Sequence, residues 1–136
     1  MIFVDSGAWI AFSNQTDQHH KDALAIYNGL KKEKARLLTT DYVIAETTTW
    51  LRYRVSHPAA IKFLDHIERA EGTDVLTVVA VDKTLFQEAK RLFRQYDSAN
   101  LSFTDCTSFA VCQAQKLSEA FAFDEHFMME GITLLG

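Results

Sequence analysis

The sequence predicts an α/β fold in which a mainly parallel sheet is covered by helices on both faces. Short apolar stretches with strand character alternate with longer stretches whose apolar residues recur every three or four positions. Such alternation indicates βα units, because two parallel strands are joined by a crossover that is usually helical. The 136 residues show no internal repeat and no break in composition, so we expect one domain over residues 1–136.

Five short segments have the composition of strands. Met1–Val4 is a continuous apolar run, which is typical of a strand buried on both faces. Val75–Val81 is rich in β-branched residues, and turn-forming or polar residues bound the other segments. The predicted strands are Met1–Val4, Leu37–Thr40, Val75–Val81, Ala120–Phe123 and the weaker Ile132–Leu134.

Helical periodicity fills the intervals between these strands. Asp41 and Asp82 can each cap the helix that follows, and Pro58 stands where another helix can begin. Ser102 and Asp105 have the spacing of a capping box. A short helical turn is expected after Phe123. The predicted helices are Ala8–Phe12, His20–Lys34, Asp41–Val55, Ala59–Ala70, Leu85–Tyr96 and a helix that opens at Ser102 and runs to Lys116.

Composition restricts the classes of function. The formal charge of −4 argues against a repressor that binds nucleic acid through a broad basic surface. It leaves a metallonuclease open, because divalent cations held by acidic side chains supply positive charge. Two cysteines are too few for a disulfide framework. No signal peptide and no apolar run of about 20 residues is apparent, so we expect a cytoplasmic protein without membrane contact.

Four acidic residues from distant segments are predicted to meet at the carboxyl edge of the sheet, where ligands of parallel sheets bind. Asp5 and Asp124 directly follow the first and fourth predicted strands. Asp105 lies in the first turn of a helix whose amino end returns towards that edge. Glu46 lies one turn before Trp50, on or beside the inward stripe of its helix, where an unpaired carboxylate would be costly.

Each acid also has an ordinary structural interpretation. Asp5 and Asp124 could be N-caps, Asp105 could complete the capping box, and Glu46 could be salt-bridged or turned to solvent. Together, however, four clustered carboxylates repel one another unless cations lie between them. Oxygen ligands with open water positions suit Mg²⁺ or Mn²⁺, which can activate water for attack on a phosphodiester. The residues therefore predict a divalent-metal site, without identifying its substrate.

Four stretches around these acids carry a resemblance. They are Ile2–Ser6 with Trp9, Tyr42–Glu46 with Trp50 and Leu51, Leu101–Asp105 with residues 108–110, and Phe121–Asp124 with His126, Phe127 and Gly131. In these stretches the sequence resembles the PIN-domain family, particularly its VapC-type toxin ribonucleases. The resemblance spans essentially the whole chain, with the four acids in the family's order and near its spacing.

This resemblance implies a three-layer α/β/α fold whose five-stranded parallel sheet has the order 3-2-1-4-5. It makes Asp5, Glu46, Asp105 and Asp124 the catalytic and metal-binding residues of a Mg²⁺- or Mn²⁺-dependent endoribonuclease. The implied products carry a 5′-phosphate and a 3′-hydroxyl. The implied role is the toxin of a type II toxin–antitoxin pair, with an RNA substrate, a cognate antitoxin and a homodimer as partners.

Two positions depart from the commonest family pattern. Ala122 stands where many members have Ser or Thr, and His126 stands where a second acid is common; the latter bears on whether a second metal is held. Thr104, beside Asp105, is interpreted as a capping hydroxyl or as a group that orients a ligand. A phosphatase of the haloacid-dehalogenase type is disfavoured, because Gly7 stands where that chemistry needs a second Asp. The remaining alternative is a PIN fold that binds RNA or protein with little or no catalysis.

Several side chains outside the acid set lead to further expectations. We expect Trp9 and Trp50 to belong to the core, and His66 to have no partner set. His19 and His20 are expected to be solvated. Arg52 and Arg54 are placed to contact RNA phosphate or an antitoxin carboxylate, because they share the helix of Glu46. We expect the remaining apolar surface to form a homodimer interface, because a small sheet cannot easily bury all of Phe63, Leu64, Phe86 and Phe93.

Overall fold

A five-stranded, fully parallel sheet forms the centre of the protein. The computed structural model describes residues 1–97 and 100–136. The strand order is β3-β2-β1-β4-β5, as the family resemblance implies. Every pair of neighbouring strands is parallel; in the register of the central strand, Phe3 is paired with both Leu38 and Ala120. The strands are β1 Ile2–Val4, β2 Leu37–Thr40, β3 Leu76–Val79, β4 Glu119–Phe121 and β5 Thr133–Leu135.

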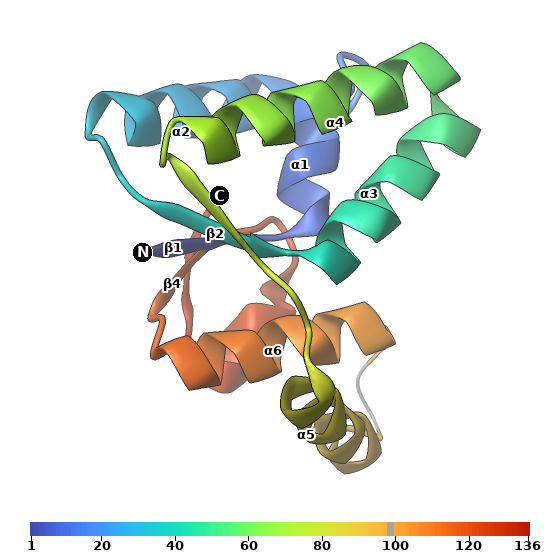
Figure 1. Ribbon diagram of the computed structural model, residues 1–136, viewed down its shortest axis with the longest axis vertical. Helices are drawn as coiled ribbons and strands as arrows, with labels where there is room; N and C mark the ends of the chain where they lie inside the picture. The colour runs from blue at the N-terminus through green and yellow to red at the C-terminus, as the bar shows by residue number, and fades with distance from the viewer. Residues whose placement is uncertain (98–99) are drawn as a thin grey trace.

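Helices cover both faces of this sheet, which confirms the predicted three-layer α/β/α class. Figure 1 shows α1, α2 and α4 on one side of the sheet and α5 and α6 on the other, with α3 rising from the end of β2. No helix within residues 1–97 or 100–136 is both long enough and apolar enough to cross a bilayer. The helices are α1 Ser6–Ser13, α2 His20–Lys32, α3 Asp41–Arg54, α4 His57–Gly72, α5 Lys83–Gln95, α6 Phe103–Gln115 and the 3₁₀ helix η1 Glu125–Glu130.

Aromatic side chains fill the core on both sides of β1. On one side the ring of Phe127 packs 5.7 Å from Phe3 and 5.2 Å from Phe109, centroid to centroid. On the other side Trp9 is fully buried and packs 5.9 Å from Phe63. The Trp9 indole donates to the hydroxyl of Thr39, which in turn donates to the Val4 carbonyl. The Trp9 indole N–H and the Thr39 hydroxyl are thereby satisfied, and the central strand is held between two packed layers.

Several element boundaries and caps differ from the sequence-based predictions. Thr40, and not Asp41, caps α3: its hydroxyl accepts a hydrogen bond from the Val43 amide at 3.0 Å. Asp41 Oδ1 instead accepts from the Val81 amide at 3.0 Å, which ties the start of α3 to the chain beyond β3. Strand β4 ends at Phe121, so two residues separate it from Asp124, which was expected to follow it directly.

The expectation that the histidines near α2 and α4 lack partners is wrong. His66 Nε2 lies 2.9 Å from the Tyr27 hydroxyl, and burial lowers the pKa of His66. His20 Nδ1 lies 2.7 Å from the Ala11 carbonyl oxygen, and the His19 ring stacks on Phe123. The His66 contact joins α4 to α2, the His20 contact joins α2 to α1, and the His19 contact reaches the segment after β4. Sequence periodicity alone does not reveal them.

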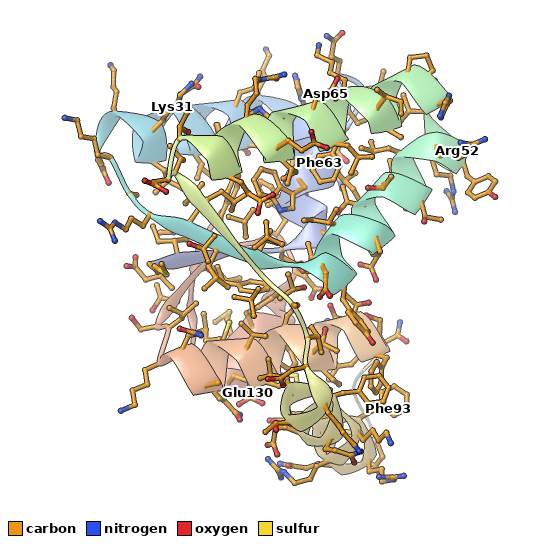
Figure 2. All side chains as sticks on the ribbon, viewed as in Figure 1. Lys31, Arg52, Phe63, Asp65, Phe93 and Glu130 are labelled. Atoms are coloured by element: carbon orange, nitrogen blue, oxygen red, sulfur yellow. The ribbon has the colours of Figure 1, made fainter. Side chains whose placement is uncertain are left out.

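The four residues that were not all expected to be buried, Phe63, Leu64, Phe86 and Phe93, differ in their exposure. The side chain of Phe63 is only 2% exposed, whereas that of Phe93 is 48% exposed. Figure 2 shows Phe63 on α4 directed into the layer beside the sheet and Phe93 on α5 at the periphery. The sheet is not the only surface that buries apolar groups, because α1, α2 and α4 also pack on one another.

We therefore expect Phe63→Ala to lower the free energy of unfolding by about 3–5 kcal/mol, the usual effect of truncating a buried Phe. Tyr53→Ala is the matched control, and its effect should not exceed about 1 kcal/mol, since the Tyr53 side chain is 79% exposed. Urea denaturation of both variants measures the difference. Equal losses would contradict the assignment of Phe63 to the core.

Candidate functional site

Asp5 lies at the carboxyl end of the central strand. Its backbone amide donates to the Phe121 carbonyl at 3.1 Å, which fixes the residue between β1 and β4. Its side chain is only 3% exposed and makes no capping hydrogen bond with α1. Among the residues that the structure describes, the buried Oδ1 atom has no hydrogen-bond partner. A buried carboxylate oxygen without a donor is costly, so this position requires a physical explanation.

Glu46 approaches the same edge from α3. Its Oε1 atom accepts a hydrogen bond of 2.6 Å from the hydroxyl of Ser6, the residue that follows Asp5 and begins α1. This bond links α1 to α3 across 40 positions of sequence and holds the Glu46 carboxylate beside the end of β1. Glu46 is half-buried and does not point to solvent on the far side of its helix.

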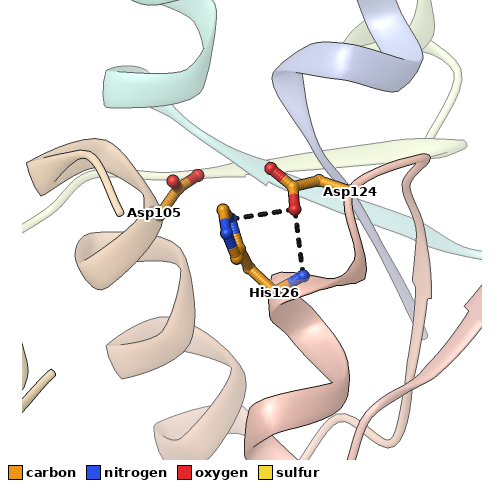
Figure 3. Close-up of side chains that lie close together, drawn as sticks. All are labelled: Asp105, Asp124 and His126. Carbon is orange, nitrogen blue, oxygen red and sulfur yellow. Dashed lines mark hydrogen bonds and ion pairs between the residues drawn. The ribbon is translucent and has the colours of Figure 1, made fainter. Parts of the chain in front are cut away.

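Asp105, Asp124 and His126 form the most compact group at this edge. One ligand atom from each lies within 4.8 Å of the corresponding atoms of the other two. Figure 3 shows the Asp105 carboxylate on α6 directed towards Asp124 and His126 at the start of η1. His126 Nδ1 lies 2.8 Å from Asp124 Oδ1. Among the described residues, Asp5 and Glu46 are not members of this close set; they lie around it.

Capping hydrogen bonds orient two of these carboxylates. Asp105 Oδ2 accepts from the Ser102 amide while the Ser102 hydroxyl accepts from the Asp105 amide, so the predicted capping box is present. Asp124 Oδ1 accepts from the His126 amide and caps η1. In both residues the capping bond uses one carboxylate oxygen, which leaves the other for a ligand. The capping interpretation is therefore correct for these two residues and compatible with a site.

The carboxylates perturb one another electrostatically. The pKa of Asp5 is raised to about 7, chiefly by burial and then by the charges of Asp105, Glu46 and Asp124, against a lowering by the hydrogen bond from the Ser6 amide. Burial also raises the pKa of Asp105, with the charges of Asp124 and Glu46 acting in the same direction and hydrogen bonds from Ser102 opposing them. All four acids thus interact at one edge, and among the described residues none of them forms an ion pair with a lysine or an arginine.

This donor set fits a divalent cation. Unpaired carboxylate oxygens at the end of a parallel sheet are the ligands that Mg²⁺ and Mn²⁺ prefer, and His126 adds a nitrogen that Mn²⁺ accepts readily. A cation between Asp5 and Asp105 would satisfy the orphaned Asp5 Oδ1 and lower both raised pKa values. The arrangement is therefore chemically competent to bind a divalent metal.

A groove adjoins the acid cluster on the side of α3. It has a volume of about 790 Å³ and shares Glu46 with the cluster. Its lining comes from α3 and from the first turn of α6: Asp41, Tyr42, Ala45, Glu46, Thr49, Trp50 and Thr104. Trp50 is half-buried and borders this groove, so the expectation that it belongs wholly to the core is only partly correct.

One contribution to this site, that of Ser6, was missed at the level of sequence, and the roles of His126 and Thr104 were left open there. Ser6 as a partner of Glu46 follows from its place beside Asp5, but only the fold brings α3 to it. His126 joins the cluster because the turn of η1 returns it towards Asp124, a geometry that helical periodicity does not predict. Thr104 lines the groove, whereas the capping hydroxyl beside it belongs to Ser102.

Comparison with known proteins identifies the family of this chain. The sequence model of the PIN domain matches residues 2–128, a span that contains all four acids. The chain belongs to the PIN-domain family. This PIN domain is 32% identical over 134 residues to the 23S rRNA-specific endonuclease VapC20 of Mycobacterium tuberculosis, in each of two strains. The alignment covers 96% of this chain and 95% of the relative.

The fold of this PIN domain is also similar to a solved structure. A crystal structure of Mycobacterium tuberculosis VapC20, described as a sarcin-ricin loop cleaving toxin, superposes with a TM-score of 0.83 at 31% identity. The superposition covers 98% of this chain and 97% of that one. The likeness extends over the whole domain, which confirms the resemblance to VapC-type proteins noted in the sequence.

The raised pKa of Asp5 leads to a pH dependence of stability in the metal-free protein. The carboxyl ionises near 3.8 as an isolated group and near 7 in the folded protein, so between these values the folded state binds the additional proton. The free energy of unfolding should therefore fall as pH rises from about 4 to 7, by on the order of 4 kcal/mol from this group.

Asp5→Asn should remove that decline, because an amide does not titrate. Urea denaturation of both proteins in EDTA, at a series of pH values, measures the difference between the two slopes. Parallel curves for the two proteins would show that Asp5 is not the buried titrating group.

Proposed function

We propose that this PIN domain is a divalent-metal-dependent endoribonuclease of the VapC type, the toxin of a toxin–antitoxin pair. The observation that carries the proposal is the buried, unpartnered carboxylate of Asp5, surrounded by Glu46, Asp105 and Asp124 at the carboxyl edge of the sheet. The similarity to VapC20, named an endonuclease specific for 23S rRNA, supports RNA as the substrate class.

Asp5, Asp105 and Asp124 would hold the metal, with Glu46 and His126 at its periphery. We propose Mg²⁺ as the resident ion, with Mn²⁺ as a substitute, because the set is dominated by carboxylate oxygens. When bound, such an ion lowers the pKa of a coordinated water and stabilises the charge that develops on a phosphodiester. Hydrolysis then leaves a 5′-phosphate and a 3′-hydroxyl.

The protein's own contribution is to fix the carboxylates before the substrate arrives. The Ser6 hydroxyl holds Glu46, the Ser102 amide holds Asp105, and the His126 amide holds Asp124. Groups that are already oriented need little rearrangement during the reaction, which is the main source of electrostatic catalysis. Glu46 faces both the cluster and the groove, so it is placed to accept a proton from an attacking water.

The acidic cluster also suggests how a partner could inhibit the enzyme. We propose that a cognate antitoxin covers the site and inserts a basic side chain among the carboxylates, where it would replace the charge of the metal. The positive charge of such a side chain satisfies the same orphaned oxygen of Asp5. Arg52 and Arg54 at the end of α3 are exposed and are available to carboxylates of the antitoxin or phosphates of RNA.

Asp5→Asn and Asp124→Asn are expected to lower the rate of RNA cleavage by at least about a hundredfold, since each removes a charged ligand of the metal. The matched control is Asp65→Asn on the outer face of α4, far from the site, which should leave the rate unchanged (Figure 2). The measurement is cleavage of 23S rRNA and of single-stranded RNA in Mg²⁺ or Mn²⁺, with EDTA as the blank.

The outcomes separate the two functions considered for this fold. Cleavage that survives EDTA and Asp5→Asn would contradict the proposed site. RNA binding by the wild type without cleavage in either metal would identify a binding module instead.

We also propose that the protein forms a homodimer through apolar surface that one chain leaves exposed. Phe93 and Met128 are 48% and 61% exposed, and Phe93 continues an aromatic cluster with Phe103 and Phe86. Exposed apolar patches of this kind are usually covered by a partner, and two-fold pairing is the commonest arrangement. Light scattering at micromolar concentration should give twice the chain mass, whereas a mass near 15.5 kDa would refute the dimer.

A further inference from the structure

The groove beside the acid cluster has aromatic walls on either side of Glu46. Tyr42, Glu46 and Trp50 follow one another at intervals of four residues, so they share one face of α3, each about 6 Å further along the helix. Thr104, in the first turn of α6, lines the groove with them. A ligand in this groove is therefore adjacent to the carboxylates on one side and to aromatic rings along α3.

The two tryptophans of the chain differ in their burial and in the hydrogen bonding of their indole groups. Trp9 is fully buried, and its indole donates to Thr39. Trp50 is half-buried, borders the groove, and makes no indole hydrogen bond with the residues that the structure describes. A large aromatic side chain beside a cluster of catalytic type is better placed to contact a ligand than to complete a core.

The side chain of Arg54 places a positive charge over the ring of Trp50. The Arg54 guanidinium lies 5.9 Å from the centroid of the Trp50 ring, within the range of a cation–π contact. The acidic side chain at the other end of the groove, Asp41, is engaged by the amides of Tyr42 and Val81. The Trp50 end of the groove therefore combines an aromatic face with positive charge, in a protein whose net charge is −4.

We propose that Trp50 is the stacking platform for one unpaired nucleobase of the RNA, next to the phosphodiester that is cleaved, and that Arg54 contacts the backbone phosphate beyond it. This inference rests on the proposed ribonuclease function and adds how the substrate strand is positioned. Aromatic rings with adjacent cations are the usual means of holding single-stranded nucleic acid, and stacking accepts every base because each has a π face. The strand would run along α3, from Glu46 towards Arg54.

Continuity with the acid cluster favours RNA as the occupant over a protein segment. Glu46 belongs to both surfaces, so a base on Trp50 lies about one helical turn from a carboxylate of the cluster. Stacking there would place the neighbouring phosphodiester at the carboxylates. A segment of the antitoxin is the competing occupant of the groove. If it were the occupant, a Trp50 substitution would change inhibition by the antitoxin and leave RNA binding unchanged.

The test compares Trp50→Leu, Trp50→Phe and the control Tyr53→Leu in single-turnover cleavage of a short single-stranded RNA that the wild type cuts. Tyr53 is an aromatic residue of the same helix, 79% exposed, that does not line the groove. We expect Trp50→Leu to raise the RNA concentration that gives half the maximal cleavage rate by roughly 5- to 150-fold. This factor is the equivalent of about 1–3 kcal/mol of stacking per base. Trp50→Phe should retain most of the affinity, and Tyr53→Leu should match the wild type.

A second substrate identifies the stacked base. In matched RNAs, the base on the 5′ or the 3′ side of the cleaved bond is removed to leave an abasic site. Removal of one of these two bases should weaken RNA binding by the wild type by the same factor as Trp50→Leu does. In the Trp50→Leu variant, the same removal should weaken RNA binding little further. Urea denaturation establishes that each variant is folded, and Trp50→Phe provides the comparison if Trp50→Leu is not.

The outcomes distinguish this inference from the proposed function. If the wild type cleaves, Asp5→Asn does not, and the Trp50 variants bind RNA like the wild type, the stacking platform is refuted and the ribonuclease stands. Independent losses from Trp50→Leu and from the abasic site would also refute it. A wild type that cleaves no RNA in either metal would overturn both.

Discussion

The structure depends on one electrostatic constraint: a carboxylate is buried at the end of the central strand with no donor for one of its oxygens. Asp5 is held there by its backbone bond to Phe121, and Asp105, Glu46 and Asp124 surround it with further negative charge. Burial without compensation is unfavourable, and a fold retains it where a ligand supplies the missing charge. The stability of the metal-free protein and its proposed chemistry therefore have the same physical origin.

The sheet topology explains why the acids converge. Strand β1 is the central strand in the order β3-β2-β1-β4-β5. The chain passes from β1 to β2 and β3 on one side of it, and later adds β4 and β5 on the other side. The carboxyl ends of β1 and β4 flank the point where strand order reverses, which is where parallel sheets bind ligands. Helices α3 and α6 begin near this edge, so Glu46 and Asp105 reach it from their first or second turns. The same arrangement leaves the groove between α3 and α6 open beside the carboxylates.

Local sequence patterns predict much of this arrangement, and tertiary packing accounts for what they miss. The apolar run of β1 places Asp5, and the spacing of Ser102 and Asp105 identifies a capping box that the structure contains. The cap of α3 was misassigned because Thr40 and Asp41 are adjacent residues that both cap well, and only the bond from Val81 distinguishes them. Which of Phe63 and Phe93 is buried could not be predicted, because packing among helices does not appear in the periodicity of one helix. The exposure of Trp50 to the groove follows from the placement of α6 beside α3, which the periodicity of α3 does not show.

The central claim is that a divalent ion is bound among Asp5, Asp105 and Asp124. Anomalous diffraction from crystals grown with Mn²⁺ tests it most directly, because the scattering locates the ion without reference to activity. We expect a peak in contact with Asp5, Asp105 and Asp124, with the Asp5 Oδ1 atom among the ligands, and no peak at that position in Asp5→Asn crystals. A manganese peak elsewhere on the protein, with no peak in contact with the Asp5 side chain, would contradict it.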